Sequence, residues 1–442
     1  MTTIQFGRRS LVRGALGAGA LAALGPLGSL LAQERGPARR IVLCDFNGGW
    51  DVLLGADARD PSVSHPGIHQ GTELLDPAYR TPIEVRCGAG RALWGAPMRA
   101  LVPHADVATV FRGVNMNTVS HPTGQSYMNT GLQPSGSSPR GSSIGTVFAS
   151  GGAMGEDGPI LPFVAIGTRS YNDRYPREAS ALRLSRAREL RPILTGAPGG
   201  LPGAIEAMLE AAREDAQSCV GPTYRGVHPA DEQLLSRERL RRLEAEGFAS
   251  RFDFDASTTA MQDIRARYGF TSVASNTPGV RAATAMQLLR SGLANAVSVR
   301  IQDGLDSHAN WGEIHPVRLE EGFTALAALI EDLRSDDPNL ERTTVVAFSE
   351  FARTPRINGN DGRDHWFAAS MLVFGGLVPA VFGATNPDDL GLLRVDETTG
   401  RPVSGEGLQL RPEHVMATLV TAAGLDASAY RVEPIRSLIP AA

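Results

Sequence analysis

The segment TTVVAFSEFARTPRINGNDGRDHW, residues 343–366, joins an apolar run to a dense group of charged side chains. Residues 343–348 contain only threonine, valine, alanine and phenylalanine, which is typical of a buried β-strand. Glu350 follows almost at once, and Asp364 and His365 come after a loop rich in glycine and asparagine. This order of residues predicts a site at the carboxyl end of a strand, where α/β sheets bind their ligands.

Other apolar runs along the chain also end in polar loops that contain glycine. The runs expected to form strands are residues 40–44, 107–111, 163–167, 296–301 and 371–374. Between them, residues 320–333 and 415–423 have apolar side chains at helical spacing. Strands that alternate with helices predict an α/β fold with a doubly wound, mostly parallel sheet sandwiched by helices. The polar loops would then gather at one edge of this sheet.

The composition is that of a globular protein. The 442 residues are 42% hydrophobic and 20% charged, and their formal net charge is −4. No basic block interleaved with aromatic residues occurs, so we expect no nucleic-acid partner. Cys44, Cys87 and Cys219 are widely spaced and lack zinc-finger spacing, so at most one disulfide can form among them. Cys44 lies in an apolar run and is expected to be a buried thiol.

The first residues have the features of an export signal. The motif RRSLV, residues 8–12, precedes a weakly hydrophobic stretch of glycine, alanine and leucine. A membrane anchor is the alternative, but the glycines and Pro26 disfavour a stable span. We expect a twin-arginine signal over residues 1–34 and transport by the twin-arginine translocase. The mature chain, residues 35–442, would then be periplasmic or secreted.

Residues 201–283 differ from the strand–helix alternation around them. Within this segment, SRERLRRLEAEGFASRF places glutamates and arginines at helical spacing. We expect a helical insertion on the surface of the α/β domain. It is either a solvated helical face or a lid over the site.

Two polar clusters in the first third of the chain follow expected strands. Asp45 and Asp51 surround a Gly-Gly pair, where carboxylates either ligate a cation or cap their own turn. Ser120 and His121 precede a helix expected to begin near Thr123 and can supply a nucleophile or a proton carrier. Simple capping of that helix is the alternative.

Two further clusters lie in the last third of the chain. Asp306 and His308 can share one metal ion, with a plain surface loop as the alternative. Arg353 and Arg356 have the fork geometry that binds phosphate, sulfate or carboxylate, or else they neutralise the neighbouring acids. Together with the Asp-His pair at 364–365, the clusters offer ligands for one or two divalent ions. Zinc is the expected metal, with calcium or magnesium as alternatives.

Four motifs carry a resemblance to a known family. FNGGWD, SHPTGQSYMNTG, LDSHANW and FSEFARTPRINGNDGRDHW, behind a twin-arginine signal, resemble the bacterial family catalogued as domain of unknown function 1501. The resemblance spans nearly the whole mature chain. The family is grouped with the alkaline phosphatase and sulfatase superfamily, so the resemblance implies an alkaline-phosphatase-like α/β sandwich. It also implies metals at the carboxyl end of the sheet.

The resemblance also implies a metal shell, position by position. Asp51 or Asp45 would be the first-strand carboxylate, Asp306 and His308 would bind one metal, Glu350 would end its strand as a ligand, and His365 beside Asp364 would be the last metal histidine. Two positions depart from the superfamily pattern. Phe351 stands where a ligand histidine is expected, which favours one metal over two. His121 stands nine residues before Thr130, at the place of the nucleophile.

The leading hypothesis is an exported metal-dependent hydrolase of phosphate or sulfate esters. His121 or Ser120 would perform the chemistry, and Arg353 or Arg356 would hold the anionic ester substrate. The alternative is a non-catalytic member of the family that binds a polysaccharide or a protein partner. A transferase or isomerase of phosphorylated compounds, which the superfamily also contains, is a third possibility. The oligomeric state is left open.

Overall fold

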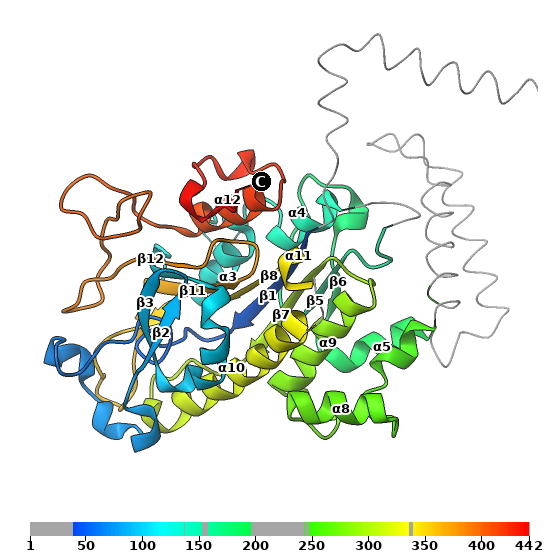
Figure 1. Ribbon diagram of the computed structural model, residues 1–442, viewed down its shortest axis with the longest axis horizontal. Coiled ribbons are helices and arrows are strands. Elements are labelled where there is room, and N and C mark those ends of the chain that lie inside the picture. The colour runs from blue at the N-terminus through cyan, green and yellow to red at the C-terminus, as the bar shows by residue number, and fades with distance from the viewer. Residues whose placement is uncertain are drawn as a thin grey trace, which may run out of the picture. The chain divides into compact units, whose positions relative to one another are not determined.

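An eight-stranded mixed sheet forms the centre of the protein (Figure 1). Its strands are β1 (Arg40–Phe46), β4 (Ala108–Asn115), β5 (Phe163–Ile166), β6 (Leu182–Leu184), β7 (Ala296–Gln302), β8 (Thr343–Phe348), β11 (Ala368–Phe374) and β12 (Ala380–Gly383). Their order across the sheet is β12-β4-β11-β8-β1-β7-β5-β6. Neighbouring strands are parallel except at β11, which runs antiparallel to β4 and β8. The predicted α/β fold with a mostly parallel sheet is confirmed.

The computed structural model describes residues 39–136, 138–152, 158–195, 243, 247–335 and 339–441. The export signal expected over residues 1–34 and the larger part of the expected insertion therefore lie outside the described residues. Of the insertion, residues 247–283 are described and include α8 (Thr259–Tyr268). The insertion was expected to reach residue 283, but α9 (Pro278–Arg290) already packs on β7 as part of the domain.

Helices cover both faces of the sheet (Figure 1). On one face lie α9 and the long helix α10 (Trp311–Ser335), and on the other lie α3 (His121–Thr130), α4 (Ile144–Gly151) and α12 (Pro412–Ala422). The burial of β1 explains the apolar run of residues 41–44. Val42 and Cys44 face the core beneath α9 and α10, whereas Ile41 and Leu43 face the opposite core. A strand buried on both faces needs an unbroken apolar run, and each such side chain contributes about 1.5–3 kcal/mol.

Smaller elements surround the sheet. They are the hairpin β2 (Ile83–Cys87) and β3 (Gly90–Trp94), the short pair β9 (Ala352–Arg353) and β10 (His365–Trp366), the short helices α5 (Leu190–Leu194) and α11 (Asn339–Arg342), and the longest 3-10 segment η4 (Ala96–Val107). The β9–β10 pair is antiparallel and sets His365 opposite Arg353. It returns the loop of residues 354–364 to the carboxyl end of β8, so the Asp-His pair lies beside the residues that follow the strand.

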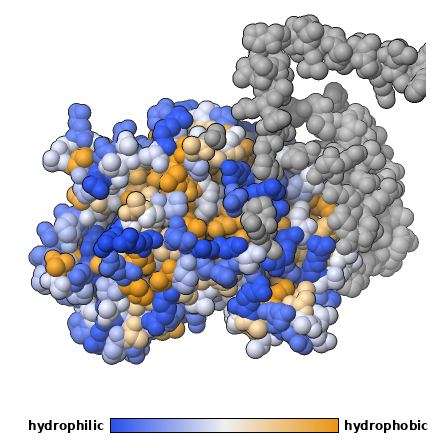
Figure 2. All heavy atoms as spheres, viewed as in Figure 1, coloured by the Kyte–Doolittle hydropathy of each residue, from blue (hydrophilic) through white to orange (hydrophobic). Residues whose placement is uncertain are grey.

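The exposed large apolar side chains of the described residues are scattered rather than gathered on one element. Exposed large apolar side chains, such as Val63, Ile193 and Val317, come from separate segments of the described chain. Figure 2 shows hydrophobic and hydrophilic residues interspersed over the visible face. No helix among the described residues is both long and apolar enough to cross a bilayer. Cys44 and Cys87 are buried free thiols, as expected for Cys44, and Cys219 lies outside the described residues.

Candidate metal centre

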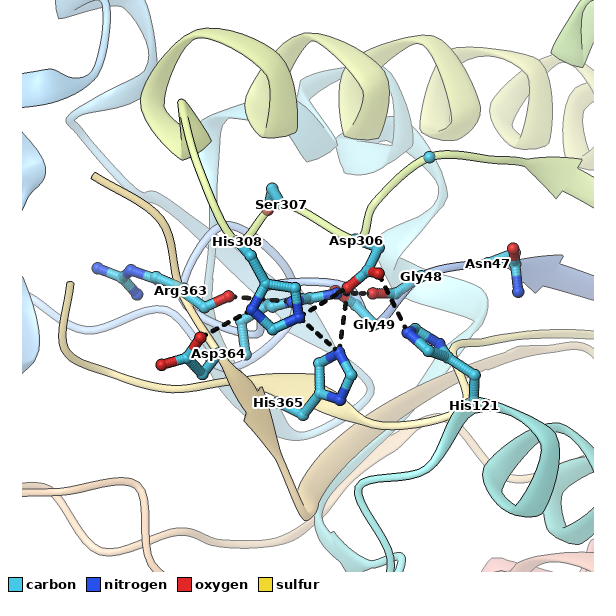
Figure 3. Close-up of polar contacts among 12 residues, drawn as sticks. Asn47, Gly48, Gly49, His121, Asp306, Ser307, His308, Arg363, Asp364 and His365 are labelled. Atoms are coloured by element: carbon cyan, nitrogen blue, oxygen red, sulfur yellow. Dashed lines mark hydrogen bonds and ion pairs between the residues drawn. The ribbon is translucent and has the colours of Figure 1, made fainter. Parts of the chain in front are cut away.

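Three histidines and one aspartate meet at the carboxyl edge of the sheet (Figure 3). Asp306 and His308 come from the loop between β7 and α10, and His365 comes from β10. His121 is the first residue of α3, which begins with Pro122 in its first turn and ends at Gly131 in the left-handed region. The structure therefore brings together residues that lie up to 244 positions apart (365 − 121).

Asp306 is the centre of this cluster. Its Oδ2 lies 3.3 Å from His121 Nε2, and its Oδ1 lies 3.1 Å from His308 Nε2 and 3.0 Å from His365 Nε2. The Nε2 atoms of His308 and His365 are 2.9 Å apart. His121, Asp306 and His365 each offer a ligand atom within 4.8 Å of the others. Ligand atoms of a tetrahedral zinc ion lie roughly 3.3 Å apart, because each is about 2.0 Å from the metal.

The second nitrogen of each histidine contacts an oxygen at 2.7 Å. His121 Nδ1 contacts Glu350 Oε1, His308 Nδ1 contacts Asp364 Oδ1, and His365 Nδ1 contacts the carbonyl oxygen of Val119. These oxygens accept hydrogen bonds, so we place the proton of each neutral ring on Nδ1. Each Nε2 then presents a lone pair to Asp306. Several lone pairs this close to a carboxylate repel one another unless a cation lies among them, and an oxygen behind each ring is the usual support of a metal-binding histidine.

Glu350 supports His121 from inside the protein. Its side chain is fully buried and accepts hydrogen bonds from the backbone N–H of Gly48, from Asn47 Nδ2 and from Ser349 Oγ. Burial alone would raise the pKa of Glu350, but the bonds from His121 and the backbone lower it below the usual value. In return, the hydrogen bond to Glu350 raises the pKa of His121. Positive charge, carried by a proton or by a metal ion, is thus favoured at this ring.

The glycines of two motifs allow this close packing. A Cβ atom on Gly48 would lie 2.4 Å from the backbone nitrogen of Asp306, and Gly48 has a φ of +118°. A Cβ atom on Gly124, in the first turns of α3, would lie 2.4 Å from the carbonyl oxygen of Glu350. Only glycine lets the three segments that carry Asp306, His121 and Glu350 approach so closely.

Arg353 is a structural part of the centre. The guanidinium is fully buried and contacts the carbonyls of Gly48, Gly49 and Arg363 as well as Asp306 Oδ1 at 2.6 Å. Four of its five N–H groups therefore bond within the protein, which favours a structural role for Arg353 over the expected role in holding a substrate anion. Arg356 is exposed and lies near Gly67, and none of its described contacts is with the histidines. The assignment of these two arginines to a substrate anion therefore stays a prediction.

Asp51 and Asp45, the two candidates for the first-strand ligand, have arginines as their charged partners. Asp51 is fully buried, with Oδ2 3.0 Å from Arg363 Nη1 and Oδ1 accepting the N–H of Leu53. Asp45 is 3.1 Å from Arg300 Nε, and burial together with Glu350 raises its pKa to about 7. Each carboxylate thus has an arginine as its counter-ion, whereas the resemblance implied a metal ion.

Two other predicted positions have clear surroundings. Phe351 is buried, and its ring centroid lies 4.7 Å from that of His121 and 4.3 Å from that of His365. It forms an apolar wall where a further ligand would be needed for a second metal. The Ser120 side chain is exposed, and its described hydrogen bond is with Thr123 Oγ1 at 3.3 Å.

Several residues that support the centre give no sign of this role in the sequence. His315, on α10, is fully buried; its Nε2 accepts the N–H of Asp51, and its Nδ1 contacts Ser307 Oγ at 2.8 Å. Burial lowers the pKa of His315 far below its usual value, so the ring is neutral and fixes the loop before His308. Ser349 Oγ accepts the N–H groups of Gly49 and Trp50.

The fold and this centre define an α/β protein with a histidine–carboxylate cluster at the carboxyl edge of its sheet. The chain belongs to the family described as "Protein of unknown function (DUF1501)", whose match covers residues 84–427. The family expected from the motifs is thereby confirmed.

Two solved structures are similar to the chain at low identity. One is Ps i-CgsB in complex with k-i-k-neocarrahexaose, with 10% identity, a TM-score of 0.35, and coverage of 90% of this chain and 74% of that chain. The other is the PsFucS1 sulfatase from Pseudoalteromonas sp., with 9% identity, a TM-score of 0.31, and coverage of 93% and 74%. No curated protein matches the chain.

Asp364 offers a direct test of whether His308 is a ligand. Asp364 is exposed, and hydrogen bonds from Asn358 and His308 lower its pKa. Asp364→Asn should weaken zinc binding by about tenfold or more, because the charge behind the His308 ring is lost, while stability without metal stays unchanged. Titration of the metal-free protein against a chromophoric chelator measures this. Asp361→Asn, on the same exposed loop, is the matched control, and equal affinities in the two variants would exclude His308 as a ligand.

Proposed function

We propose that the chain is an exported, metal-dependent hydrolase of phosphate or sulfate esters that uses one divalent ion, zinc in the first place. His121, Asp306 and His365 would hold the ion, with His308 as the fourth ligand. One observation carries the proposal: three histidine Nε2 atoms, each with an oxygen behind the ring, converge on one carboxylate. The near neighbours add three carboxylates, Glu350, Asp306 and Asp364, against the single guanidinium of Arg353. Their net charge of −2 (−3 + 1) with neutral histidines favours a cation.

The chain's own groups would bind and orient the ester. When bound, a divalent ion supplies Lewis-acid polarisation of an ester oxygen. The side chains of Asp306 and His308 are each 45% exposed, so the centre is open to a substrate from solvent. Both nitrogens of His121 are engaged, by Glu350 and by Asp306, which favours a ligand over a nucleophile. Ser120 has no described base in contact with its hydroxyl, so we assign the attack to water.

Elemental analysis and ester turnover test this proposal together. Protein purified from the exported fraction should contain about one zinc ion per chain, and the His308→Ala/His365→Ala variant should contain almost none. The metal-loaded wild type should hydrolyse an aryl phosphate or an aryl sulfate, and the double variant should be slower by roughly two orders of magnitude or more. Ser120→Ala should keep most of the activity. Absence of metal from folded wild-type protein would overturn the proposal.

A non-catalytic role is the second candidate, and one observation favours it. Arg353 directs four of its five N–H groups to carbonyl oxygens and to Asp306, so the arginine nearest the histidines has little capacity left to hold a substrate anion. A family member that binds a polysaccharide or a protein partner would need the fold and the ion, but not turnover. Stoichiometric zinc without hydrolysis of either ester would support this second candidate.

A further inference from the structure

A polar cavity of about 480 Å³ is built from other parts of the chain than the histidine cluster. It is lined by residues at the end of β4, by Gln133 after α3, and by the segment between β12 and α12, which Figure 1 draws in orange and red. The lining is almost entirely polar. Amide side chains contribute Asn117, Gln133 and Gln409, and two arginines, Arg394 and Arg411, stand among them. A cavity of this volume accommodates a small organic molecule.

The two arginines of this cavity are not neutralised. Among the described residues, neither guanidinium has a carboxylate oxygen within 4.0 Å. Arg394 Nη1 donates to the carbonyl oxygen of Gly407 at 2.7 Å, and Arg411 Nε is buried without a hydrogen-bond partner. By contrast, Arg353 and Arg363 at the carboxyl edge are each paired with an aspartate. An unpaired guanidinium with an unmet donor in a polar cavity favours an anionic acceptor, because a charge-assisted hydrogen bond is stronger than one to a neutral oxygen.

His414 adds a neutral donor at the same place. It is only 7% exposed, and its Nδ1 accepts the N–H of Arg411 at 3.2 Å. Nε2 therefore carries the proton, and among the described residues it has no partner although the side chain lines the cavity. Burial and then the charge of Arg411 lower the pKa of His414 to about 4, so the ring stays neutral at pH 7. Both residues belong to the start of α12, where the helix dipole also favours an anion.

Nearby carboxylates do not cancel this positive charge. Glu413, in the first turn of α12, accepts a hydrogen bond from the hydroxyl of Tyr127 at 2.5 Å. Among the described residues it has no arginine within ion-pair distance. Glu397 lines the cavity, but it is exposed. Two guanidiniums and one lining carboxylate leave a net charge of +1 (+2 − 1) with His414 neutral.

We propose that this cavity is a binding site for an organic oxyanion, a molecule that carries a carboxylate, sulfate or phosphate group. Arg394, Arg411 and the Nε2–H of His414 would bind the anionic group. The amides of Asn117, Gln133 and Gln409, which both donate and accept, would bind hydroxyl or carbonyl groups of the ligand body. The site is separate from the histidine cluster, so it does not depend on the proposed hydrolase activity.

Calorimetric titration with three simple anions tests the proposal. Sodium sulfate, phosphate and citrate are titrated into the full-length protein treated with chelator, at an ionic strength held constant with sodium chloride. We expect saturable binding of at least one of them, at least tenfold weaker in both Arg394→Gln and Arg411→Gln. Arg401→Gln removes an exposed arginine of the same segment that does not line the cavity, and it should bind like the wild type. The anion that binds most tightly identifies the recognised group.

Two further measurements separate this site from the metal centre and from misfolding. The His308→Ala/His365→Ala variant should bind the anion as tightly as the wild type, because neither residue lines the cavity. Arg411 precedes α12 and its loss can weaken that helix, whereas Arg394 lies on an exposed loop, so Arg394→Gln tests the proposal in a folded protein. The proposal is overturned if none of the three anions binds saturably, or if folded Arg394→Gln binds them as tightly as the wild type.

Discussion

Glu350→Ala should lower the free energy of unfolding of the metal-free protein by about 3–5 kcal/mol. The carboxylate is fully buried and accepts hydrogen bonds from Asn47, Gly48, Ser349 and His121, so its removal leaves several buried donors without an acceptor. Urea unfolding in the presence of a chelator measures the loss. Glu433→Gln, on a side chain that is 89% exposed, is the control and should change stability by well under about 1 kcal/mol.

Glu350→Gln separates shape from charge at the same position. The amide fills the same space but cannot accept bonds from His121 and from the Gly48 N–H with both of its groups, so we expect an intermediate loss of stability. Zinc affinity should also fall by about 10- to 100-fold, because the His121 ring loses its charged support. Unchanged zinc affinity in folded Glu350→Gln protein would show that His121 does not bind the ion.

The lowered pKa of Glu350 predicts that the free energy of unfolding depends on pH. Because the pKa of Glu350 is lower in the folded chain than in the unfolded chain, its stabilising contribution is fully present above the unfolded value of about 4.3. This contribution is lost as the pH falls from there through the folded pKa. The wild type should therefore lose stability between about pH 5 and pH 3 more steeply than Glu350→Gln. Parallel curves for the two proteins would contradict the assignment of the negative charge to Glu350.

Much of the centre could be predicted from local sequence because its residues follow strands of one sheet. The strands β7 and β8 are followed by Asp306 and Glu350, and the pairing of β9 with β10 brings His365 back beside them. Parallel strands place their carboxyl ends at a common edge of the sheet. The role of each side chain at this edge could not be predicted in the same way. Arginine is a residue type that binds anions, yet the guanidinium of Arg353 donates to backbone carbonyls 304 and 305 positions earlier in the chain.

Other contacts of the centre cannot be predicted from the residue types. The oxygen behind His365 is the backbone carbonyl of Val119, which any residue could supply. His315 contacts Ser307 and accepts the N–H of Asp51, and its residue type does not distinguish this supporting role from that of a metal ligand. The antiparallel direction of β11 could not be predicted either, because a short apolar run fits a parallel and an antiparallel strand equally well.

Asp51→Asn decides between the two roles considered for this carboxylate. In the structure Asp51 and Arg363 form an ion pair at 3.0 Å, with side-chain exposures of 0% and 2%, and the guanidinium also lies 4.1 Å above the Trp311 ring. Asp51→Asn leaves Arg363 buried without its counter-ion and should lower the free energy of unfolding by about 3–5 kcal/mol. Zinc content should stay at about one ion per chain, because both oxygens of Asp51 already bind groups of the protein, Arg363 and the N–H of Leu53.

Arg363→Met and the double variant complete this cycle. Arg363→Met should cost about as much as Asp51→Asn, and the double variant should cost less than the sum, because no unpaired charge is left in the interior. The surface pair of Arg334 and Asp106, at 2.6 Å, is the matched control, and Asp106→Asn should cost at most about 1 kcal/mol. A metal ligand would behave in the opposite way. If Asp51→Asn lost its zinc while the metal-free protein kept its stability, Asp51 would belong to the metal shell, and the buried ion pair would not describe its function.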